Sequence, residues 1–353
     1  MVSMLYYKVT HNLKIHGFSK APSIPLPPLL PGVVNDPTRR LIRKLLVSHT
    51  FIVSAYYYPT SKSPENRGPT VAINTVMDSV SSDLRNLLLG VVVSNKTHWE
   101  KTLATIQRVE NKKCRFVSVL ALTTSVANLT TLEVTSGEYR TEIPFKVARY
   151  AAPKPVIICI SPLLLAEQWQ LFLQQVHVAH QFGAHFHIYI TSIIESFFNL
   201  MKEYEKQNYI TIDYWLRIKF AQTETSFFEP NSNMEMQNTA GSHIDCLLQY
   251  KESAEFVAFF NIDDMLIPSR HPTYIEEFLA ELALEPNASS IYYLRRDSRI
   301  SIENTDAFNV RKTIESIREA DDSQSGTSIL KTDSLKNNNW IPMYIRNEES
   351  GRR

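Results

Sequence analysis

The spacing of apolar positions divides the chain into two parts. Between residues 51 and 150 the apolar runs are short and are separated by polar turns, as is typical of neighbouring β-strands. The runs are FIVSAYYY (51–58), TVAINTVM (70–77), LLLGVVV (87–93), RFVSVLAL (115–122) and EIPFKVARY (142–150). We therefore predict a smaller β-rich region over residues 46–150. Residues 1–45 are rich in proline and basic side chains and predict an irregular segment.

From residue 156 the pattern changes to strands that alternate with helical periods. Strands are predicted at 156–160, 185–191, 209–215, 256–262 and 289–296. Ser161 and Pro162 look like the start of a helix that ends near Gly183, and further helices are expected at 192–208, up to about residue 250, and from Pro272 to about residue 284. This alternation predicts an α/β fold with a doubly wound, mostly parallel sheet. Beyond Arg299 the pattern fades.

Composition and charge narrow the class of protein. The 353 residues include 37 basic and 36 acidic side chains, so the chain has no net field that would attract nucleic acid or an anionic membrane. No apolar run is long enough for a membrane span, and the first residues lack the apolar stretch of a signal peptide. Three N-glycosylation sequons begin at Asn95, Asn128 and Asn287 and give weak support for a lumenal location.

The three cysteines are too few for a disulfide framework. Cys159 falls in an apolar strand and Cys246 in a helical pattern, so we expect buried free thiols, with one bridge as the alternative.

The most informative segment is AEFVAFFNIDDMLIP, residues 254–268. An apolar strand ends there in Asn261, Asp263 and Asp264, and open α/β sheets bind ligands beyond the carboxyl ends of their strands. Amide and carboxylate oxygens suit Mg²⁺ or Mn²⁺, and such ions commonly bridge carboxylates to substrate phosphates. The segment predicts a metal–diphosphate site with Asp263 and Asp264 as metal ligands; the alternative is a solvated turn.

Other phosphate chemistries lack their required residues. The sequence has no G-x-x-x-x-G-K-[ST] loop, no G-x-G-x-x-G after a strand and no G-x-S-x-G elbow. An aspartate-nucleophile phosphatase would need a carboxylate where Asn261 stands. The remaining chemistry is that of a nucleotide-sugar glycosyltransferase, in which a metal replaces the glycine-rich loop and a general base activates the acceptor hydroxyl.

Further side chains are candidates by position alone. Asp245 precedes the acidic strand and could approach the donor, and Asp297 and Glu315 are candidate bases. Tyr56–Tyr58 and Trp169 could stack on sugar, although such rings are mostly structural. The histidines at 177, 180, 185 and 187 are expected to pack rather than to bind a metal.

Residues 153–300 resemble glycosyltransferase family 92, a group of type II membrane glycosyltransferases. The resemblance rests on VIICISPLLLAEQWQLFL, HVAHQFGAHFHIYITSIIE, YITIDYWLR, IDCLLQYKESAEFVAFFNIDDMLIP and YIEEF, and FIVSAYYYPTSKS resembles the region that precedes the catalytic domain. It implies a GT-A-like fold, a catalytic domain over residues 153–348, a UDP-sugar donor (galactose or a related hexose), a divalent metal, and transfer to glycan acceptors in the Golgi. The D-x-D-D motif of the family falls on Asn261, Asp263 and Asp264.

Three departures from the family pattern motivate a second hypothesis. Asn261 replaces the usual leading aspartate, no signal-anchor is visible, and Pro342 stands where the family tends to carry a histidine shortly before the chain ends. The alternative is therefore a catalytically impaired family member, apparently truncated at its C-terminus, that binds glycan or nucleotide.

Overall fold

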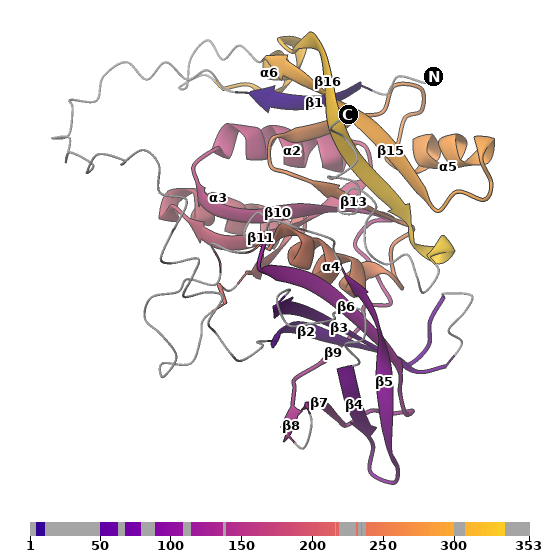
Figure 1. Ribbon diagram of the computed structural model, residues 1–353. Coiled ribbons are helices and arrows are strands. Elements are labelled where there is room, and N and C mark those ends of the chain that lie inside the picture. Colours follow the sequence, from indigo (N-terminus) through magenta and orange to yellow (C-terminus); the bar gives the residue numbers. More distant parts are fainter. Residues whose placement is uncertain are drawn as a thin grey trace, which may run out of the picture.

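The computed structural model describes two eight-stranded sheets with helices packed on and between them (Figure 1). The structure describes residues 5–10, 50–62, 68–78, 89–108, 114–136, 139–215, 217–218, 231, 234, 238–299 and 308–335. The chain is therefore α/β, as the apolar pattern predicts.

The first sheet combines a parallel part with an antiparallel part. Strands β10, β11, β12 and β13 pair in parallel, while β16 pairs antiparallel with both β13 and β15. Strand β1 runs parallel to β15 and antiparallel to β14. Across the sheet the order is β12 (Ile210–Tyr214), β11 (Ala184–Ile193), β10 (Val156–Ala166), β13 (Phe256–Phe260), β16 (Arg318–Lys331), β15 (Ser290–Arg299), β1 (Leu5–Thr10) and β14 (Asp264–Ile267).

Helices cover both faces of the parallel part. On one face α2 (Trp169–Gln181), α3 (Glu195–Lys206) and α5 (Tyr274–Leu284) contribute apolar side chains to a core shared with β10, β11 and β13. The residues Phe172, Val176 and Ala179 are buried at the spacing of a single helix face. The helix α2 ends at Gln181, and Gly183 follows with a φ of 86°, a conformation that glycine adopts without strain.

Helix α4 (Thr239–Tyr250) lies on the opposite face, between the two sheets (Figure 1). The apolar residues of α4 pack against β10 and β13 and also against the second sheet. Polar side chains of the second sheet fix the helix backbone: Asn74 Nδ2 donates to the Gly241 carbonyl at 2.7 Å, and the Tyr58 hydroxyl donates to the Leu248 carbonyl at 2.7 Å. The buried helix is thus held from both sides.

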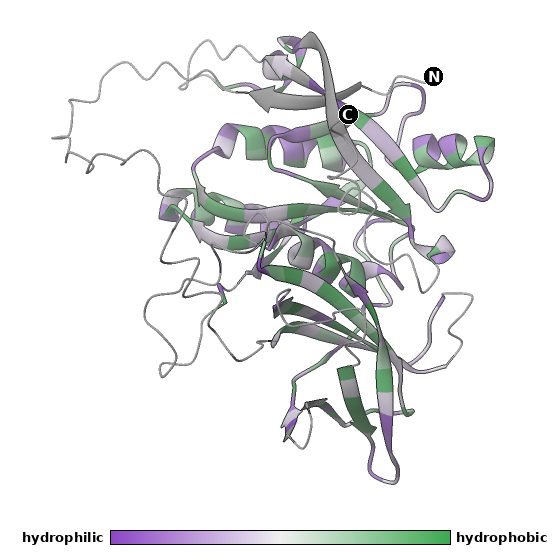
Figure 2. Ribbon diagram, viewed as in Figure 1, coloured by the Kyte–Doolittle hydropathy of each residue, from purple (hydrophilic) through white to green (hydrophobic). Residues whose placement is uncertain are grey.

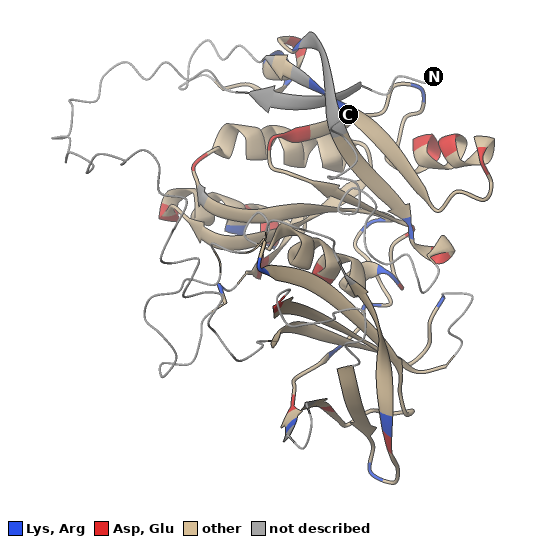
Figure 3. Ribbon diagram, in the orientation of Figure 1, with Lys and Arg blue, Asp and Glu red and all other residues tan. Residues whose placement is uncertain are grey.

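The second sheet is built from residues 50–147 and follows the predicted β-rich region. Its order is β8 (Tyr139–Glu142), β7 (Thr131–Ser136), β4 (Leu89–Ser94), β5 (Trp99–Arg108), β6 (Phe116–Thr124), β3 (Thr70–Asp78), β2 (Thr50–Tyr58) and β9 (Lys146–Val147). Apolar residues dominate the central strands of both sheets, and charged residues gather on helices such as α5 and on turns (Figures 2 and 3). The domain boundaries at 45, 150 and 153–348 stay predictions.

The first sheet is where the structure departs most from the predicted elements. Ser161 and Pro162 do not begin a helix, because β10 continues to Ala166 with irregular pairing to β11 after Ile160. A short helix, α6 (Val310–Glu315), a 3₁₀ turn at Thr332–Ser334 and β16 follow the point where the apolar pattern fades. Among the residues that the structure describes, no helix has the length and apolar character needed to cross a membrane.

Candidate functional site

The predicted acidic segment forms a tight turn between β13 and β14. The Asp264 backbone N–H donates to the Asn261 carbonyl at 3.0 Å, and the Asn261 N–H donates to Asp264 Oδ2 at 3.0 Å. Asp264 is only 3% exposed, and its Oδ1 lies 3.8 Å from the Arg295 guanidinium on β15. One carboxylate oxygen of Asp264 therefore closes the turn, and the other faces a cation.

Asn261 and Asp263 are the partly exposed polar residues of the same turn. They offer one amide oxygen and one carboxylate at the carboxyl end of a parallel strand. Within the described residues no group of three or more His, Cys, Asp or Glu side chains could hold a metal ion. This donor set fits a hard divalent cation of the kind that takes one or two protein ligands and completes its coordination with substrate phosphates and water.

Strand register places four polar side chains along one edge of the parallel sheet. Ile160 pairs with Ile188 and Phe260, and Ile188 pairs with Ile212. The residues that follow these positions are Ser161, Tyr189, Asp213 and Asn261. They lie at the same level of the sheet, where β13 has ended and β12 is one residue from its end, while β10 and β11 continue. With neighbouring strands about 4.8 Å apart, Asp213 and Asn261 are separated by three strand spacings, about 14 Å.

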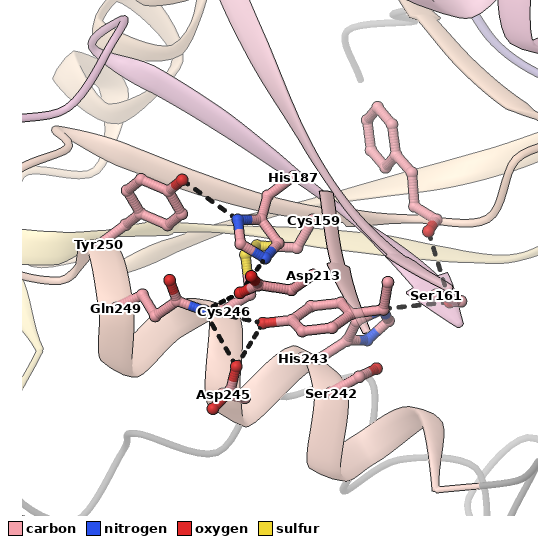
Figure 4. Close-up of a disulfide and its surroundings, with 12 residues drawn as sticks. Cys159, Ser161, His187, Asp213, Ser242, His243, Asp245, Cys246, Gln249 and Tyr250 are labelled. Carbon is pink, nitrogen blue, oxygen red and sulfur yellow. Dashed lines mark hydrogen bonds and ion pairs between the residues drawn. A yellow bond between two sulfur atoms is a disulfide. The ribbon is translucent and has the colours of Figure 1, made fainter. Parts of the chain in front are cut away.

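Helix α4 approaches this edge with polar residues of its own (Figure 4). The Ser161 hydroxyl lies 3.1 Å from His243 Nε2 and 3.4 Å from the Phe260 carbonyl. The His243 ring packs on Phe259 at a centroid distance of 5.1 Å. Complete burial lowers the pKa of His243 to about 3, so the imidazole is neutral at physiological pH.

A disulfide joins α4 to the central strand β10. Cys159 and Cys246 are bonded, with their Cα atoms 6.1 Å apart, so the expectation of two free thiols is wrong. The two residues are remote in sequence and lie on facing elements, a proximity that the local pattern could not reveal. The bond anchors α4 at the residue next to Asp245, and it anchors β10 two residues before Ser161.

A second polar cluster lies at the β11–β12 end of the same edge. Asp245 accepts hydrogen bonds from the Tyr56 hydroxyl at 2.9 Å, from the Tyr189 hydroxyl at 2.6 Å and from Gln249 Nε2 at 3.0 Å. Gln249 Nε2 also donates to Asp213 Oδ2 at 3.0 Å (Figure 4). Burial raises the pKa of the Tyr56 and Tyr189 hydroxyls above the usual range, and the nearby Asp245 carboxylate adds to this effect. Both hydroxyls therefore keep their protons and donate hydrogen bonds.

Asp213 is the more accessible carboxylate of this cluster. His187 Nε2 lies 3.2 Å from Asp213 Oδ2, and the Asp213 side chain is 31% exposed. Hydrogen bonding from His187, together with that from Gln249, holds the pKa of the Asp213 carboxyl well below its usual value, although burial opposes this shift. Asp213 is therefore a fixed, ionised acceptor.

Tyr189, Asp213 and Asp245 line a cavity of about 740 Å³. Its other walls come from β2, from the segment 144–146 and from the residues that follow β12. Sequence reasoning named Asp245 as a candidate but missed Asp213 and Tyr189. The signal for Asp213 was its place near the end of YITIDYW, because ligand-binding residues collect at strand ends in parallel sheets. Tyr189 lies within β11 and is brought to the site by its pairing with Asp213.

The remaining candidates lie in packed or exposed positions. Tyr56, Tyr57 and Tyr58 are buried, and Trp169 packs edge-to-face on Phe308 at 5.4 Å. His177 and His180 pack against Tyr209, and His185 and His187 are buried; these positions fit packing roles. Glu315 pairs with Arg311 on the exposed end of α6. The Asp297 side chain and Pro342 lie outside the described residues.

Comparisons with known proteins match the second half of the chain and much of the first. The family model of glycosyltransferase family 92 matches residues 154–341, which include the acidic turn, α4 and the ends of β11 and β12. Three curated glycosyltransferase family 92 proteins of Caenorhabditis elegans are 45%, 36% and 35% identical over 312, 310 and 294 residues. These alignments cover 88%, 87% and 82% of this chain and 61%, 60% and 58% of the relatives. The chain thus spans about three-fifths of the length of these curated relatives.

Proposed function

Because the chain belongs to glycosyltransferase family 92, we propose that it is a metal-dependent glycosyltransferase that moves galactose or a related hexose from a UDP-sugar to a hydroxyl of a glycan acceptor. The observation that carries the proposal is the turn at Asn261–Asp264. It presents oxygen ligands at the carboxyl end of a parallel strand inside the region that matches the family.

The strand arrangement supports a GT-A-like, doubly wound sheet. Three parallel strands precede β13 in the spatial order β12-β11-β10-β13, with α2 and α3 on one face and α4 on the other. This arrangement brings the ends of four strands to one edge. A nucleotide sugar bound along that edge would place its diphosphate beside the acidic turn.

We propose distinct roles for the residues of the turn. Asp263 is the main metal ligand and Asn261 assists with its amide oxygen, because both are partly exposed. Asp264 stays close to the donor and holds the turn through the Asn261 N–H, which also keeps the Asp263 carboxylate in place. When bound, Mn²⁺ or Mg²⁺ supplies positive charge that stabilises the diphosphate leaving group.

The transfer itself has a simple balance of bonds. The acceptor hydroxyl forms a new bond to the anomeric carbon of the hexose, the bond from that carbon to the diphosphate breaks, and the hydroxyl proton passes to a base. The neutral His243 imidazole already contacts Ser161 Oγ and is buried, so it serves to position Ser161 within β10.

Two observations support folding in the lumen of the secretory pathway, and we propose a Golgi location for the protein. The Cys159–Cys246 disulfide is typical of an oxidising compartment. The sequon asparagines Asn128 and Asn287 are both exposed on turns, where an N-linked glycan could be attached.

A catalytically impaired, ligand-binding family member is the second candidate. The observation that favours it is the engagement of Asp264 with the Asn261 N–H and Arg295, which leaves Asp263 as the more accessible acid of the turn. Such a protein would bind UDP or glycan without turnover.

Calorimetric titration of UDP with and without Mn²⁺ tests the proposal. The parent should bind UDP in a Mn²⁺-dependent manner, and Asp263→Ala should weaken that binding at least tenfold. Asp333→Ala is the matched control, since Asp333 is an exposed aspartate paired with Lys331 far from the turn. Equal Mn²⁺-dependent binding by Asp263→Ala and the parent would refute the assignment. Binding without any transfer from UDP-galactose or UDP-glucose would favour the second candidate.

A further inference from the structure

The acidic turn is held by a helix as well as by its own hydrogen bonds. The Gln175 side chain on α2 is 3% exposed, and its Nε2 donates to the backbone carbonyl of Asp264. Three positions further along the same face of the helix, Val178 packs with Met265, the residue after Asp264. One face of α2 therefore contacts the segment in which the turn passes into β14.

The polar groups of Asp264 are engaged by three different parts of the chain. Its N–H and Oδ2 close the turn with Asn261, its Oδ1 lies 3.8 Å from the Arg295 guanidinium, and its carbonyl accepts the hydrogen bond from Gln175. Strand β14 begins at this residue and is the last of the described strands in its sheet. The position of Asp264, and with it that of the neighbouring Asp263, thus depends on α2 and β15 as well as on the turn.

The adjacent glutamine on α2 provides a comparison within the same helix. Gln174 is 2% exposed, and its Nε2 has no hydrogen-bond partner among the residues that the structure describes. The two amides are equally buried, and the contact to the turn is made by Gln175. Removal of the Gln175 amide would leave the buried Asp264 carbonyl without this donor, which is unfavourable, whereas Gln174 can be replaced without loss of such a contact.

We propose that Gln175 is a positioning residue for the metal ligand Asp263: it fixes the backbone of Asp264 and thereby the direction of the preceding carboxylate. The assignment rests on the proposed metal-dependent transfer. A ligand side chain that is already held in place binds a metal more tightly than one that must first be ordered, because ordering costs free energy. Loss of the Gln175 hydrogen bond should therefore weaken metal binding and leave the contacts of bound UDP unchanged.

The test compares Gln175→Met with Gln174→Met in the full chain. Methionine keeps an unbranched side chain of similar length and removes the amide. UDP is titrated calorimetrically at a series of Mn²⁺ concentrations. Gln175→Met should raise the Mn²⁺ concentration needed for half-maximal UDP binding about fivefold or more, and it should leave the UDP affinity at saturating Mn²⁺ within about twofold of the parent. Gln174→Met should leave both quantities within about twofold.

Hydrogen exchange of the free protein provides a readout that needs neither UDP nor metal. The amide hydrogens of Asn261 and Asp264 are bonded within the turn, so the exchange of a peptide that contains both residues reports how often the turn opens. This exchange should be faster in Gln175→Met and unchanged in Gln174→Met. Gln175→Asn, which retains an amide but is one methylene shorter, should behave like Gln175→Met and serves as the second variant.

The two measurements separate positioning from a purely structural role. Equal Mn²⁺ dependence and equal exchange in the Gln175 and Gln174 variants would overturn the assignment. Faster exchange with an unchanged Mn²⁺ dependence, or a loss of UDP affinity that persists at saturating Mn²⁺, would also overturn it, since Gln175 would then support the fold alone. A parent without Mn²⁺-dependent UDP binding would overturn the proposed function together with this assignment, whereas failure of the assignment alone leaves the binding of the parent intact.

Discussion

The two ends of the parallel sheet edge are built in different ways. At the β13 end, two hydrogen bonds that join residues three positions apart close the turn Asn261–Asp264, and Gln175 on α2 also donates to the Asp264 carbonyl. At the β12 end, the cluster around Asp245 joins residues from β2, β11 and α4, with Tyr56 separated from Asp245 by 189 positions. The shape of the first site is set mainly within a short segment, with support from Arg295 and Gln175, whereas the second site forms only when both sheets are assembled around α4.

This difference predicts how each end responds to substitution. A change within the turn should affect ligand binding or stability according to which residue is replaced. A change that loosens α4 should affect the cavity first, because α4 contributes Asp245 and Gln249 to it. The following variants test the contrast, beginning with the largest expected effect.

Removal of the Cys159–Cys246 disulfide should have the largest effect on stability. The bond closes a separation of 87 residues, and the loop-closure argument gives about 4.6 kcal/mol of unfolding free energy for a loop of that size. The double variant Cys159→Ala/Cys246→Ala should lose that amount of unfolding free energy in urea unfolding. An unchanged unfolding free energy in the double variant would contradict this stabilising role of the disulfide.

Within the turn, Asp264→Ala and Asp263→Ala should separate stability from binding. Asp264 is buried beside Arg295, and removal of one partner of a buried ion pair costs about 3 kcal/mol. Asp263 is partly exposed, so its replacement should cost less than about 1 kcal/mol while it removes Mn²⁺-dependent UDP binding. Urea unfolding and UDP calorimetry on both variants measure this, and similar stability losses would contradict the division of roles.

The contrast between local and assembled sites also explains how much the sequence could predict. The strands at 51–58, 70–77 and 115–122 were predicted nearly to their ends, because β3 and β6 are buried along almost the whole run and β2 is buried over its second half. The turn after Phe260 was predicted for the same reason, since a fully buried strand ends abruptly in polar residues. Patterns of this kind depend only on neighbours in the sequence.

The missed elements depend on partners elsewhere in the chain. Strand β16 lies between β13 and β15, but its sequence READDSQSGTSILK has apolar residues only near its end, where Ile329 and Leu330 are buried. Strands β5 and β7 were missed because their polar residues interrupt the apolar runs. The extension of β10 beyond Ser161 and the disulfide follow from the contacts of β11 and α4, which no local pattern encodes.

Acidification should destabilise the fold through the buried histidines. The pKa of His243 is about 3 and that of His185 about 4 in the folded protein, because burial disfavours the charged imidazole. Unfolded histidine titrates near 6.5, so between these values the unfolded chain binds more protons and stability falls as the pH falls. His243 alone should cost about 2 kcal/mol between pH 7.5 and pH 5. Urea unfolding at both pH values measures the loss, and His243→Gln should make it smaller; an unchanged loss in that variant would exclude His243 as a source.

The hydroxyl donors of the cavity wall should give the smallest effects and the sharpest comparison. Tyr56→Phe and Tyr189→Phe each remove a hydrogen bond to the Asp245 carboxylate, which costs about 1.5 kcal/mol because the acceptor is charged and buried. Tyr57→Phe is the control on the same strand, since the Tyr57 hydroxyl donates to the neutral carbonyl of Val126 at 3.2 Å and its loss should cost about 0.5 kcal/mol. Urea unfolding gives the three values. Equal losses in all three variants would show that the charge of the Asp245 carboxylate does not strengthen the two hydrogen bonds that it accepts from Tyr56 and Tyr189.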